Sequence, residues 1–492
     1  MAMLAGMAAP LGFAPYGWFF VPWLAMTVWL LLSLRLPPRR AAWHGWLFGF
    51  GMFSIGIYWV HVSIYLYGNA GLPLALSVML LLAAYLAVYP ALAAWLLATL
   101  RRKSAPVNLL LIAPAAWIAA EWLRGWLFTG FPWLDLGYSQ IDSPLATVAP
   151  VLGAYGVGLA TMLIAGLLSL VLSAGCIARA FAGITVLALL AATWFGAGHE
   201  WTRPAGAPLT ATLVQGNIAQ DLKWQPDQQA ATLDTYRSLS EQHPDSALLV
   251  WPETAIPAFY DEVDENFIEP LRKKLAAQGT SLITGIPVLD RAEWKYFNAV
   301  ISLADPGRFY FKVHLVPFGE YLPLRDWLSN LLSFLPVPQA DFSSGAPDQP
   351  LLTAAGYPFS ASICYEIAFG EQLRRAARAA AFMVNVSNDA WFGDSAAPHQ
   401  HLEMARMRAL ETGRYLLRAT NTGISAIIGP TGRIIARSGQ FRAETLTATI
   451  EPRGGDTPYM RWGDYPVVIF SALVLSLPVL VRRRLGRAGK KR

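Results

Sequence analysis

Charged side chains are scarce in the first 200 residues of this chain, which contain only 12 of them. The stretches between these charges are apolar, and most are longer than the ~18 residues that suggest a membrane-spanning helix. Of all 492 residues, 14% are charged, whereas an average soluble protein has about 25%. We therefore expect the first two fifths of the chain to lie in a membrane, and the same composition excludes a disordered or collagen-like chain.

Eight apolar segments are candidates for membrane spans. They cover residues 2–17, 18–34, 43–66, 71–100, 106–128, 145–173, 180–198 and 465–481. The first two segments are barely long enough to cross a membrane completely, because a straight span needs roughly 17 residues or more. We predict a helical bundle of about eight spans, with seven before residue 200 and one near the C-terminus.

Basic residues mark the cytoplasmic side of a membrane protein. They follow the second, fourth, sixth and eighth spans, at 35–40, 101–103, 179 and 482–492. This parity places both termini in the cytoplasm and the region between spans seven and eight outside it. The last eleven residues hold seven positive charges, and the rest of the chain has 31 basic and 32 acidic residues. The net charge of +6 therefore gives little support for a nucleic acid partner.

Residues 200–462 have an ordinary composition and indicate one globular domain. Apolar runs typical of strands occur at 209–214, 247–251, 281–284, 299–303, 308–313, 359–363, 381–386, 424–428 and 445–450. Helical spacing occurs at 226–242, 262–277, 368–380 and 400–417. Strands mixed with helices predict an α/β domain. The predicted organisation is a transmembrane domain at 1–199, this domain at 200–462, a last span at 463–482 and a basic tail at 483–492.

Three polar residues follow predicted strands of this domain, where α/β sheets usually bind ligands. Glu253 follows 248–252, Lys312 is the next-to-last residue of the run 308–313, and Cys364 follows 359–363. Each has an ordinary explanation when taken alone: a solvated carboxylate, a surface cation and a small buried thiol. Cys176 is the only other cysteine, so no disulfide framework is possible.

Together, these three residues resemble the Glu-Lys-Cys triad of the carbon-nitrogen hydrolase (nitrilase) superfamily. Its members carry the triad in this chain order on strand ends of an α-β-β-α sandwich. With the flanking spans, the chain resembles the apolipoprotein N-acyltransferase family over essentially its full length. Other matching segments are residues 131–133, 137–140, 214–217, 387–393, 400–414 and 418–423. The resemblance implies a nitrilase-like sandwich inserted before the last span.

The resemblance also assigns roles to residues. It implies that Glu253 is the general base, Lys312 the catalytic lysine and Cys364 the nucleophile. Four further residues match positions that the family uses around its active site. They are Trp224, Glu320, Tyr365 and Glu366.

The side chains suggest the same chemistry. A thiol with a pKa near 8.5 is only a few per cent ionised at neutral pH, so an acyl-transfer cysteine needs a base, a cation or a helix N-terminus to activate it. Glu253 would take the proton from Cys364, and Lys312 would stabilise the oxyanion formed when the thiolate attacks an ester. The resemblance implies a phospholipid acyl donor, typically phosphatidylethanolamine. It implies the N-terminal α-amino group of an S-diacylglyceryl-cysteine apolipoprotein as acceptor, with ping-pong kinetics.

Two competing functions remain open. A membrane-anchored amidase or nitrilase would use the same triad and pass the acyl group to water, although so many spans would be excessive for an anchor. A non-catalytic transporter or scaffold would not need a complete triad. We expect a monomer in the bacterial inner membrane, with its catalytic domain on the periplasmic side and no cofactor or metal ion.

Three smaller features also have expected roles. Glu121 and Arg124, spaced i and i+3 in the fifth span, are expected to pair, with head-group binding as an alternative. His399 and His401 lack further residues at metal-ligand spacing, so surface or helix-cap roles are expected. Residues 327–336 have the composition of an interfacial arm or of an ordinary packed helix.

Overall fold

The computed structural model describes all residues except 69, 197, 324–340 and 489–492. The chain divides into two compact units. The helical unit contains Met1–His61, Gly71–His199 and Arg461–Arg492, and the sandwich unit contains Val62–Ala70 and Glu200–Met460. The predicted interfacial arm at 327–336 lies outside the described residues.

Apolar helices make up the helical unit. Their bounds are α1 Ala2–Ala8, α2 Phe20–Ser33, α3 Pro38–Gly56, α5 Leu72–Leu86, α6 Val88–Leu100, α8 Ala113–Arg124, α9 Ala149–Ser173, α10 Cys176–Phe195 and α18 Tyr465–Ala488. Several begin with a proline in the first turn, as α3, α5 and α9 do. A proline is tolerated there because the first turn has no intrahelical partner for its missing N–H.

In the described part of the chain, four helical segments are long and apolar enough to cross a membrane. They are Leu72–Leu100, Ala105–Arg124, Pro144–Ser173 and Cys176–Trp194. The predicted span at 43–66 is instead a pair of helices, α3 and α4 (Val60–Leu66), bent by 52° at a short break. Counting this pair as one span gives five. These helices fit a multi-pass membrane protein.

Small residues allow α3 and α6 to pack closely. A Cβ atom added at Gly45 would lie 2.9 Å from the Cα of Ala91, and one at Gly49 would lie 2.9 Å from the Cα of Ala87. Such distances are too short for real side chains. Two glycines four residues apart on one helix face therefore bring the two backbones together, as is common between helices in membranes.

The buried ion pair of the helical unit differs from the one predicted. Arg124 pairs with Asp135 at 2.5 Å, and both side chains are 2% exposed. Its guanidinium also donates to the carbonyl of Phe131 at 3.0 Å. Glu121 instead accepts from the backbone N–H of Leu136 at 2.9 Å. The predicted Glu121–Arg124 pair is wrong because Arg124 ends α8, so its side chain reaches the acceptors of the following loop.

The described strands of the sandwich unit form two six-stranded sheets and a short two-stranded one. The first large sheet has the order β13-β2-β3-β4-β5-β6, and the second has the order β12-β11-β10-β9-β8-β7. The bounds in the first are β2 Leu209–Gln215, β3 Leu248–Val250, β4 Ser281–Asp290, β5 Lys295–Ser302, β6 Phe309–Phe311 and β13 Glu444–Ile450. Those in the second are β7 Leu352–Ala354, β8 Tyr357–Ile363, β9 Phe382–Ser387, β10 Leu416–Thr420, β11 Ala426–Ile428 and β12 Ile434–Arg437.

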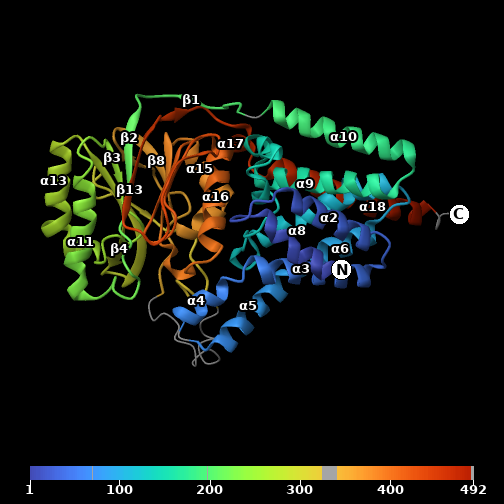
Figure 1. Ribbon diagram of the computed structural model, residues 1–492, viewed down its shortest axis with the longest axis horizontal. Coiled ribbons are helices and arrows are strands. Elements are labelled where there is room, and N and C mark those ends of the chain that lie inside the picture. The colour runs from blue at the N-terminus through green and yellow to red at the C-terminus, as the bar shows by residue number, and fades with distance from the viewer. Residues whose placement is uncertain (69, 197, 324–340, 489–492) are drawn as a thin grey trace. The chain divides into compact units, whose positions relative to one another are not determined.

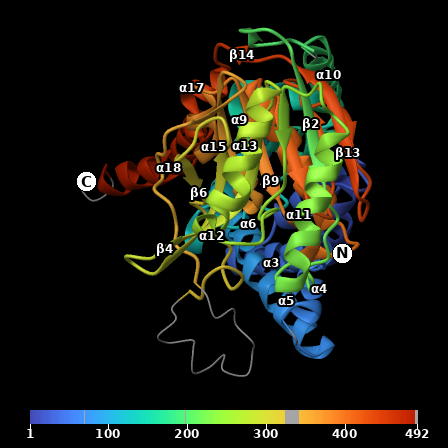
Figure 2. The ribbon, with the colours of Figure 1, turned by 90° about the vertical axis from the view of Figure 1, so that its left-hand side faces the viewer.

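Helices cover the outer faces of the two sheets (Figure 1). Helices α11 (Pro226–Glu241) and α13 (Glu269–Ala277) lie across the first sheet, and Figure 2 shows them in front of its strands. Helices α15 (Gly370–Ala377) and α16 (Ala397–Thr412) cover the second sheet. The predicted α-β-β-α layering is confirmed.

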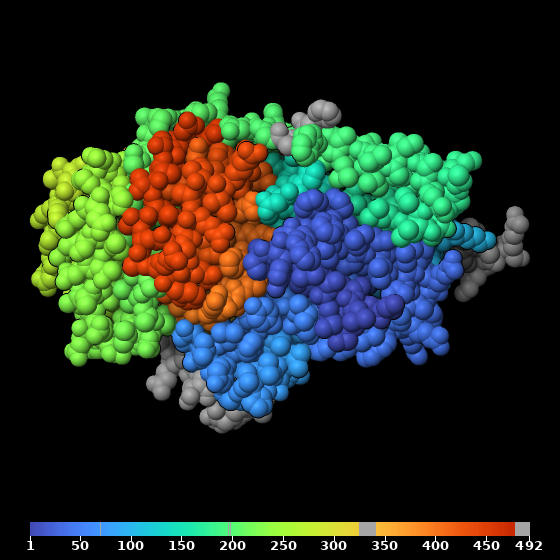
Figure 3. Space-filling view, viewed as in Figure 1, coloured from blue at the N-terminus to red at the C-terminus, as the bar shows by residue number. Residues whose placement is uncertain are grey.

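Alternation along the strands creates two apolar layers, because successive strand side chains point to opposite faces. On β3, Leu248 and Val250 join the core that also contains Phe359 of β8. Leu249 joins the other cluster, which contains Leu271 of α13. In Figure 3, the C-terminal part of this unit (red) lies beside its N-terminal part (green), as the antiparallel pairing of β13 with β2 requires.

One predicted helix boundary is wrong. Residues 400–417 were expected to form a single helix, but α16 ends at Thr412, and Gly413 follows in the left-handed conformation with φ of 59°. Glycine adopts this conformation without steric cost and commonly ends helices. Leu416 and Leu417 then begin β10, which pairs in parallel with β9.

Strand direction explains why the predicted site residues meet. Strands β2, β3 and β4 run parallel, as do β8, β9 and β10. Strand β6 is antiparallel to β5, and β5 is antiparallel to β4, so β6 runs in the same direction as β3 and β4. The segments after β3 and β6, which carry Glu253 and Lys312, therefore leave the first sheet at the same edge.

Candidate active site

Glu253 lies in the loop after β3, and its side chain is buried. Its Oε1 accepts a hydrogen bond from Asn298 Nδ2 at 2.7 Å and lies 4.0 Å from Lys312 Nζ. Gly285 of β4 packs against this loop, and a Cβ there would lie 2.7 Å from the Cα of Glu253. Burial raises the pKa of Glu253, although Lys312 opposes this rise. The carboxylate is thus a stronger base than one in water.

Lys312 follows β6 and is 1% exposed. Its Nζ donates to Glu320 Oε1 at 2.8 Å, and its backbone N–H donates to the carbonyl of Asn298 at 2.8 Å. Burial lowers the pKa of Lys312, but the Glu320 and Glu253 carboxylates outweigh burial and raise it above the usual value. The ammonium therefore stays charged between two carboxylates, as a fixed cation beside any reacting group.

Cys364 follows β8 and begins the 3-10 turn η7 (Cys364–Ala368). Its φ of 51° is unusual for a residue other than glycine, and such strained positions cluster at functional sites. Burial and the Glu253 carboxylate raise the pKa of the thiol to about 12, although Lys312 opposes them. The resting thiol is therefore neutral at pH 7 and must lose its proton to a base during attack.

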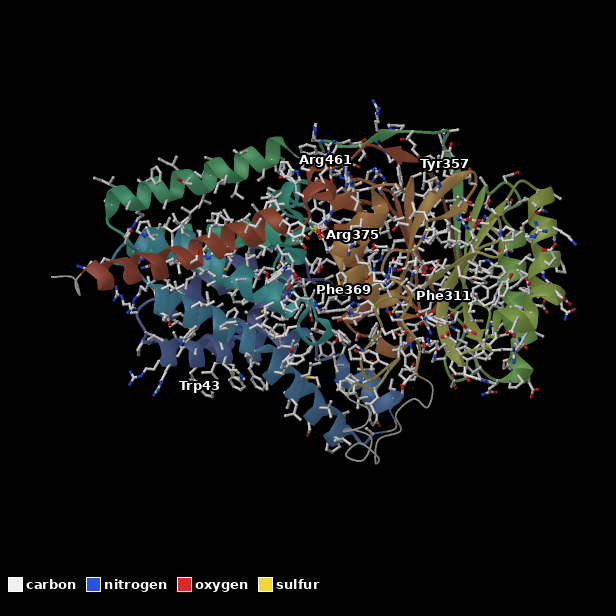
Figure 4. All side chains as sticks on the ribbon, turned by 180° about the vertical axis from the view of Figure 1, so that it is seen from behind. Trp43, Phe311, Tyr357, Phe369, Arg375 and Arg461 are labelled. Atoms are coloured by element: carbon white, nitrogen blue, oxygen red, sulfur yellow. The ribbon has the colours of Figure 1, made fainter. Side chains whose placement is uncertain are left out.

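Glu366 joins the nucleophile's turn to the lysine's segment. Its carboxylate accepts from the backbone N–H groups of Ile363 and Val313, both at 2.7 Å. It also accepts from the hydroxyl of Tyr310 at 3.0 Å. Figure 4 labels Phe311 and Phe369, which lie at the ends of the two segments that Glu366 connects. This carboxylate therefore joins the backbone before Cys364 to the backbone after Lys312. The sequence predicted it only as a residue near the active site.

The other two predicted residues differ in exposure. Tyr365 is buried and packs against the rings of Phe369 and His314, with centroid distances of 5.1 and 5.8 Å. Trp224 lies in the segment between β2 and α11, and its side chain is 52% exposed. The Trp224 ring is therefore accessible at the surface of this unit.

A polar network supports Cys364 from α16 and β10, and the sequence interpretation missed it. His401 is 1% exposed, and its Nε2 lies 3.1 Å from the carbonyl of Cys364. Its Nδ1 lies 2.9 Å from Arg418 Nη2 and 3.0 Å from Asp389 Oδ1. Burial favours neutral Asp389, but Arg418, His401 and the Ser387 hydroxyl together outweigh burial and hold the pKa of Asp389 below its usual range.

The expected surface or cap role for His401 is therefore wrong. Burial and the Arg418 cation lower the pKa of His401, so the ring is neutral. A carbonyl oxygen can only accept, so the ring N–H at Nε2 donates to the Cys364 carbonyl, whereas Nδ1 lies between the Arg418 guanidinium and the Asp389 carboxylate. His399, which has partial exposure, lies in the first turn of α16. Within the described residues, no group of three or more His, Cys, Asp or Glu is placed to hold a metal ion.

Asn298 is a second residue that the sequence interpretation missed. It bonds to Glu253 through its side chain and to Lys312 through its carbonyl. The only local signal was a polar residue at the start of the apolar run 299–303. Because both partners are distant in sequence, the pairing of β5 with β6 was needed to reveal this role.

Comparisons with known proteins cover both units. Residues 5–167 match the family model of the apolipoprotein N-acyltransferase N-terminal domain, and residues 210–459 match the carbon-nitrogen hydrolase model. The chain is 47% identical over 98% of its length to an apolipoprotein N-acyltransferase of Methylococcus capsulatus, covering 96% of that protein. It is 42% identical over 99% of its length to the Azotobacter vinelandii enzyme of that name, covering 96% of it.

A solved structure is similar to about half of this chain at low identity. Nit3 of Saccharomyces cerevisiae, a nitrilase superfamily member, is 21% identical to this chain. The similarity covers 52% of this chain and 93% of Nit3, with a TM-score of 0.38.

Proposed function

This chain belongs to the apolipoprotein N-acyltransferase family, and we propose that it transfers a fatty acyl chain from a membrane phospholipid to an apolipoprotein. The acceptor is the N-terminal α-amino group of S-diacylglyceryl-cysteine. The observation that carries the proposal is the buried cluster in which Lys312 lies 4.0 Å from Glu253 and both charges act on the thiol of Cys364.

In the first half-reaction, the Cys364 sulfur attacks the carbonyl carbon of a phospholipid ester. Glu253 takes the thiol proton as the S–C bond forms, so a neutral resting thiol is sufficient. The charge that develops on the carbonyl oxygen is stabilised by the permanently charged Lys312. The C–O bond then breaks, Glu253 returns the proton to the leaving alcohol oxygen, and a lysophospholipid departs from the thioester.

In the second half-reaction, the α-amino nitrogen of the acceptor attacks the thioester carbonyl. Glu253 takes a proton from the amine as the C–N bond forms, and Lys312 again faces the oxyanion. The C–S bond breaks, and the sulfur recovers its proton from Glu253. The product is an amide, and the reaction order is ping-pong because the first product leaves before the second substrate reacts.

The proposed architecture places this chemistry at a membrane surface. About eight spans hold the chain in the bacterial inner membrane, with residues 1–199 and 463–482 as the transmembrane parts. The catalytic domain at 200–462 precedes the last span on the periplasmic side, and the tail at 483–492 is cytoplasmic. The support for this orientation is the distribution of basic residues. The enzyme acts as a monomer.

A topology experiment tests the orientation. We expect a periplasm-active alkaline phosphatase fused after Ser343 to be active and the same reporter after Arg492 to be silent, because the tail of seven positive charges stays in the cytoplasm. A cytoplasm-active reporter at the same positions is the matched control and should show the reverse pattern. Phosphatase activity at the C-terminus alone would contradict the assignment, because the thiol would then face away from exported lipoproteins.

The function itself is tested by separating its two halves. Purified wild-type protein incubated with phosphatidylethanolamine alone should gain the mass of one acyl chain on the peptide containing Cys364. Addition of a diacylated lipopeptide with a free N-terminus should remove this mass and acylate the peptide's amino group. Parallel incubations with phosphatidylglycerol and phosphatidylcholine establish the head-group preference. Release of free fatty acid without lipopeptide acylation would show that water, not the amine, takes the acyl group from the enzyme, and would overturn the proposal in favour of a hydrolase.

A further inference from the structure

A buried lysine beside the general base has no part in the triad. Lys223 lies in the segment between β2 and α11, next to Trp224, and is 3% exposed. Its Nζ donates to the backbone carbonyl of Glu253 at 3.1 Å and to the hydroxyl of Thr254. The two hydrogen bonds therefore hold the peptide unit that joins Glu253 to Thr254, one at its carbonyl and the other at the side chain of the residue that follows it.

That peptide unit needs a restraint. Thr254 has a φ of 46°, a conformation that is rare and costly for a β-branched residue. The hydroxyl of Thr254 and the carbonyl of Glu253 would both be left without the ammonium donor if Lys223 were apolar. Because this loop determines where the Glu253 carboxylate points, its restraint determines the geometry of proton transfer.

The segment that carries Lys223 is itself held at its other end. The side chain of Asn421 donates to the carbonyl of Ile218 at 2.7 Å and accepts from its N–H at 2.8 Å. Gln220 accepts from Asn388 Nδ2 at 2.6 Å. Both asparagines follow strands of the second sheet, so the segment spans from those strand ends to the loop of Glu253. The segment that carries Lys223 is therefore itself held in place by hydrogen bonds to the second sheet's strand ends.

Charge provides a second link between Lys223 and Glu253. The charged groups that act on Glu253 are Lys312, Glu320 and Lys223, and the Glu253 carboxylate in turn acts on the Cys364 thiol. The Lys223 cation lowers the pKa of Glu253, opposing burial, which raises it. Burial in turn lowers the pKa of Lys223 to about 8, although Glu253 opposes that shift. Removal of the Lys223 charge would thus make Glu253 harder to ionise.

We propose that Lys223 is a positioning residue that holds the loop of Glu253 in the geometry required for proton transfer in both half-reactions. This inference rests on the proposed acyl transfer. It adds a residue that touches neither substrate but acts through the base, and it predicts that turnover depends on Lys223 while phospholipid binding does not.

The test compares Lys223→Met and Lys223→Arg in the full-length protein, with Lys273→Met as a matched control. Lys273 is 71% exposed and makes a surface contact of 3.4 Å with Glu269. Lys223→Met should lower kcat about 10- to 100-fold, the range expected when a reacting group is misplaced by about 1 Å. The KM for phosphatidylethanolamine should stay within about twofold, because no substrate contact is lost. Lys223→Arg should recover part of the loss, and Lys273→Met should match the wild type.

The pH profile separates this role from a general loss of structure. In Lys223→Met, the acid limb of kcat/KM should move to higher pH because Glu253 loses a nearby cation. In Lys223→Arg, the limb should stay near the wild-type position. Thr254→Val should slow turnover in the wild type and add little in Lys223→Met, since the two residues form one contact.

The outcomes distinguish the inference from the function on which it rests. If Lys223→Met keeps a wild-type kcat while Glu253→Gln is inactive, the positioning role is wrong and the acyl transfer stands. The role would also be wrong if Lys223→Met and Lys223→Arg lowered kcat equally and the acid limb of the pH profile stayed at its wild-type position in Lys223→Met. If Cys364→Ala still transfers acyl groups, the proposed mechanism itself is wrong, whatever the Lys223 variants show.

Discussion

Cys364→Ala should abolish acyl transfer and thioester formation together. The thiol is the only group at the candidate site that can form the proposed covalent intermediate, and alanine leaves no atom to accept the acyl chain. Because Cys364 is a small side chain of low exposure, its replacement removes one sulfur atom and changes the packing little. The measurement is lipopeptide acylation by mass spectrometry, with the thermal unfolding midpoint as a check on folding.

Cys364→Ser and Cys176→Ala complete this experiment. The serine hydroxyl is far less acidic than a thiol, so it should also fail to carry out transfer with a base suited to cysteine. Cys176, the exposed first residue of α10, belongs to the helical unit, and its loss should leave the rate unchanged. Near-normal transfer by Cys364→Ala would eliminate the thioester mechanism. If Cys176→Ala lost transfer and Cys364→Ala kept it, the intermediate would form on Cys176 and the assignment to Cys364 would be wrong.

Glu253→Gln and Lys312→Met should each lower the rate by at least ~100-fold, by analogy with the loss of one oxyanion-hole donor. Glutamine keeps the shape of Glu253 but cannot accept a proton. The Cys364 thiol should therefore stay protonated, and no thioester should form. Methionine keeps the length of Lys312 but removes the cation that faces the oxyanion. Quenched mass spectrometry of the Cys364 acyl adduct measures the first half-reaction in each variant.

Lys312→Met needs a second variant as a control for folding. It leaves Glu320, 2.8 Å from Lys312 Nζ in the wild type, beside Glu253 without their shared cation, and a buried unpaired charge is destabilising. The double variant Lys312→Met/Glu320→Gln removes that imbalance and should regain stability but remain inactive. If this double variant or Glu253→Gln retained a rate within a few fold of the wild type, the role assigned to the missing side chain would be wrong.

Local patterns of residues were sufficient for the main architecture. The apolar stretches predicted membrane helices because hydrophobic length is a property of consecutive residues. The runs before Glu253 and Cys364 correspond to strands β3 and β8, since a short continuous apolar run is also a property of consecutive residues. The α-β-β-α layers and the family followed from the order of three strand-end residues together with the flanking apolar segments. The triad roles remain predictions; Glu253 and Lys312 lie 4.0 Å apart, and both act electrostatically on the Cys364 thiol.

Local patterns failed where partners were distant or where a boundary depended on one residue. The break between α3 and α4 lies within the predicted span 43–66, and the average hydropathy of that stretch gives no sign of it. The end of α16 depended on the left-handed Gly413, and the apolar residues that follow fit a strand as well as a helix. Arg124 was expected to pair within its helix, but the loop that follows offered Asp135 as a closer partner.

By itself, the sequence determined which segments are apolar enough for a membrane and which runs form the sandwich. It also determined which carboxylate, lysine and thiol lie at the ends of its strands. Only the tertiary structure decided how these groups are supported. His401 reaches the Cys364 carbonyl from 37 residues away, Asn298 bonds to Glu253 from 45 away, and Lys223 bonds to the Glu253 carbonyl from 30 away. Hydrogen bonds require atoms to meet at about 3 Å in the right direction, and for residues this far apart in sequence that meeting depends on strand register and loop conformation.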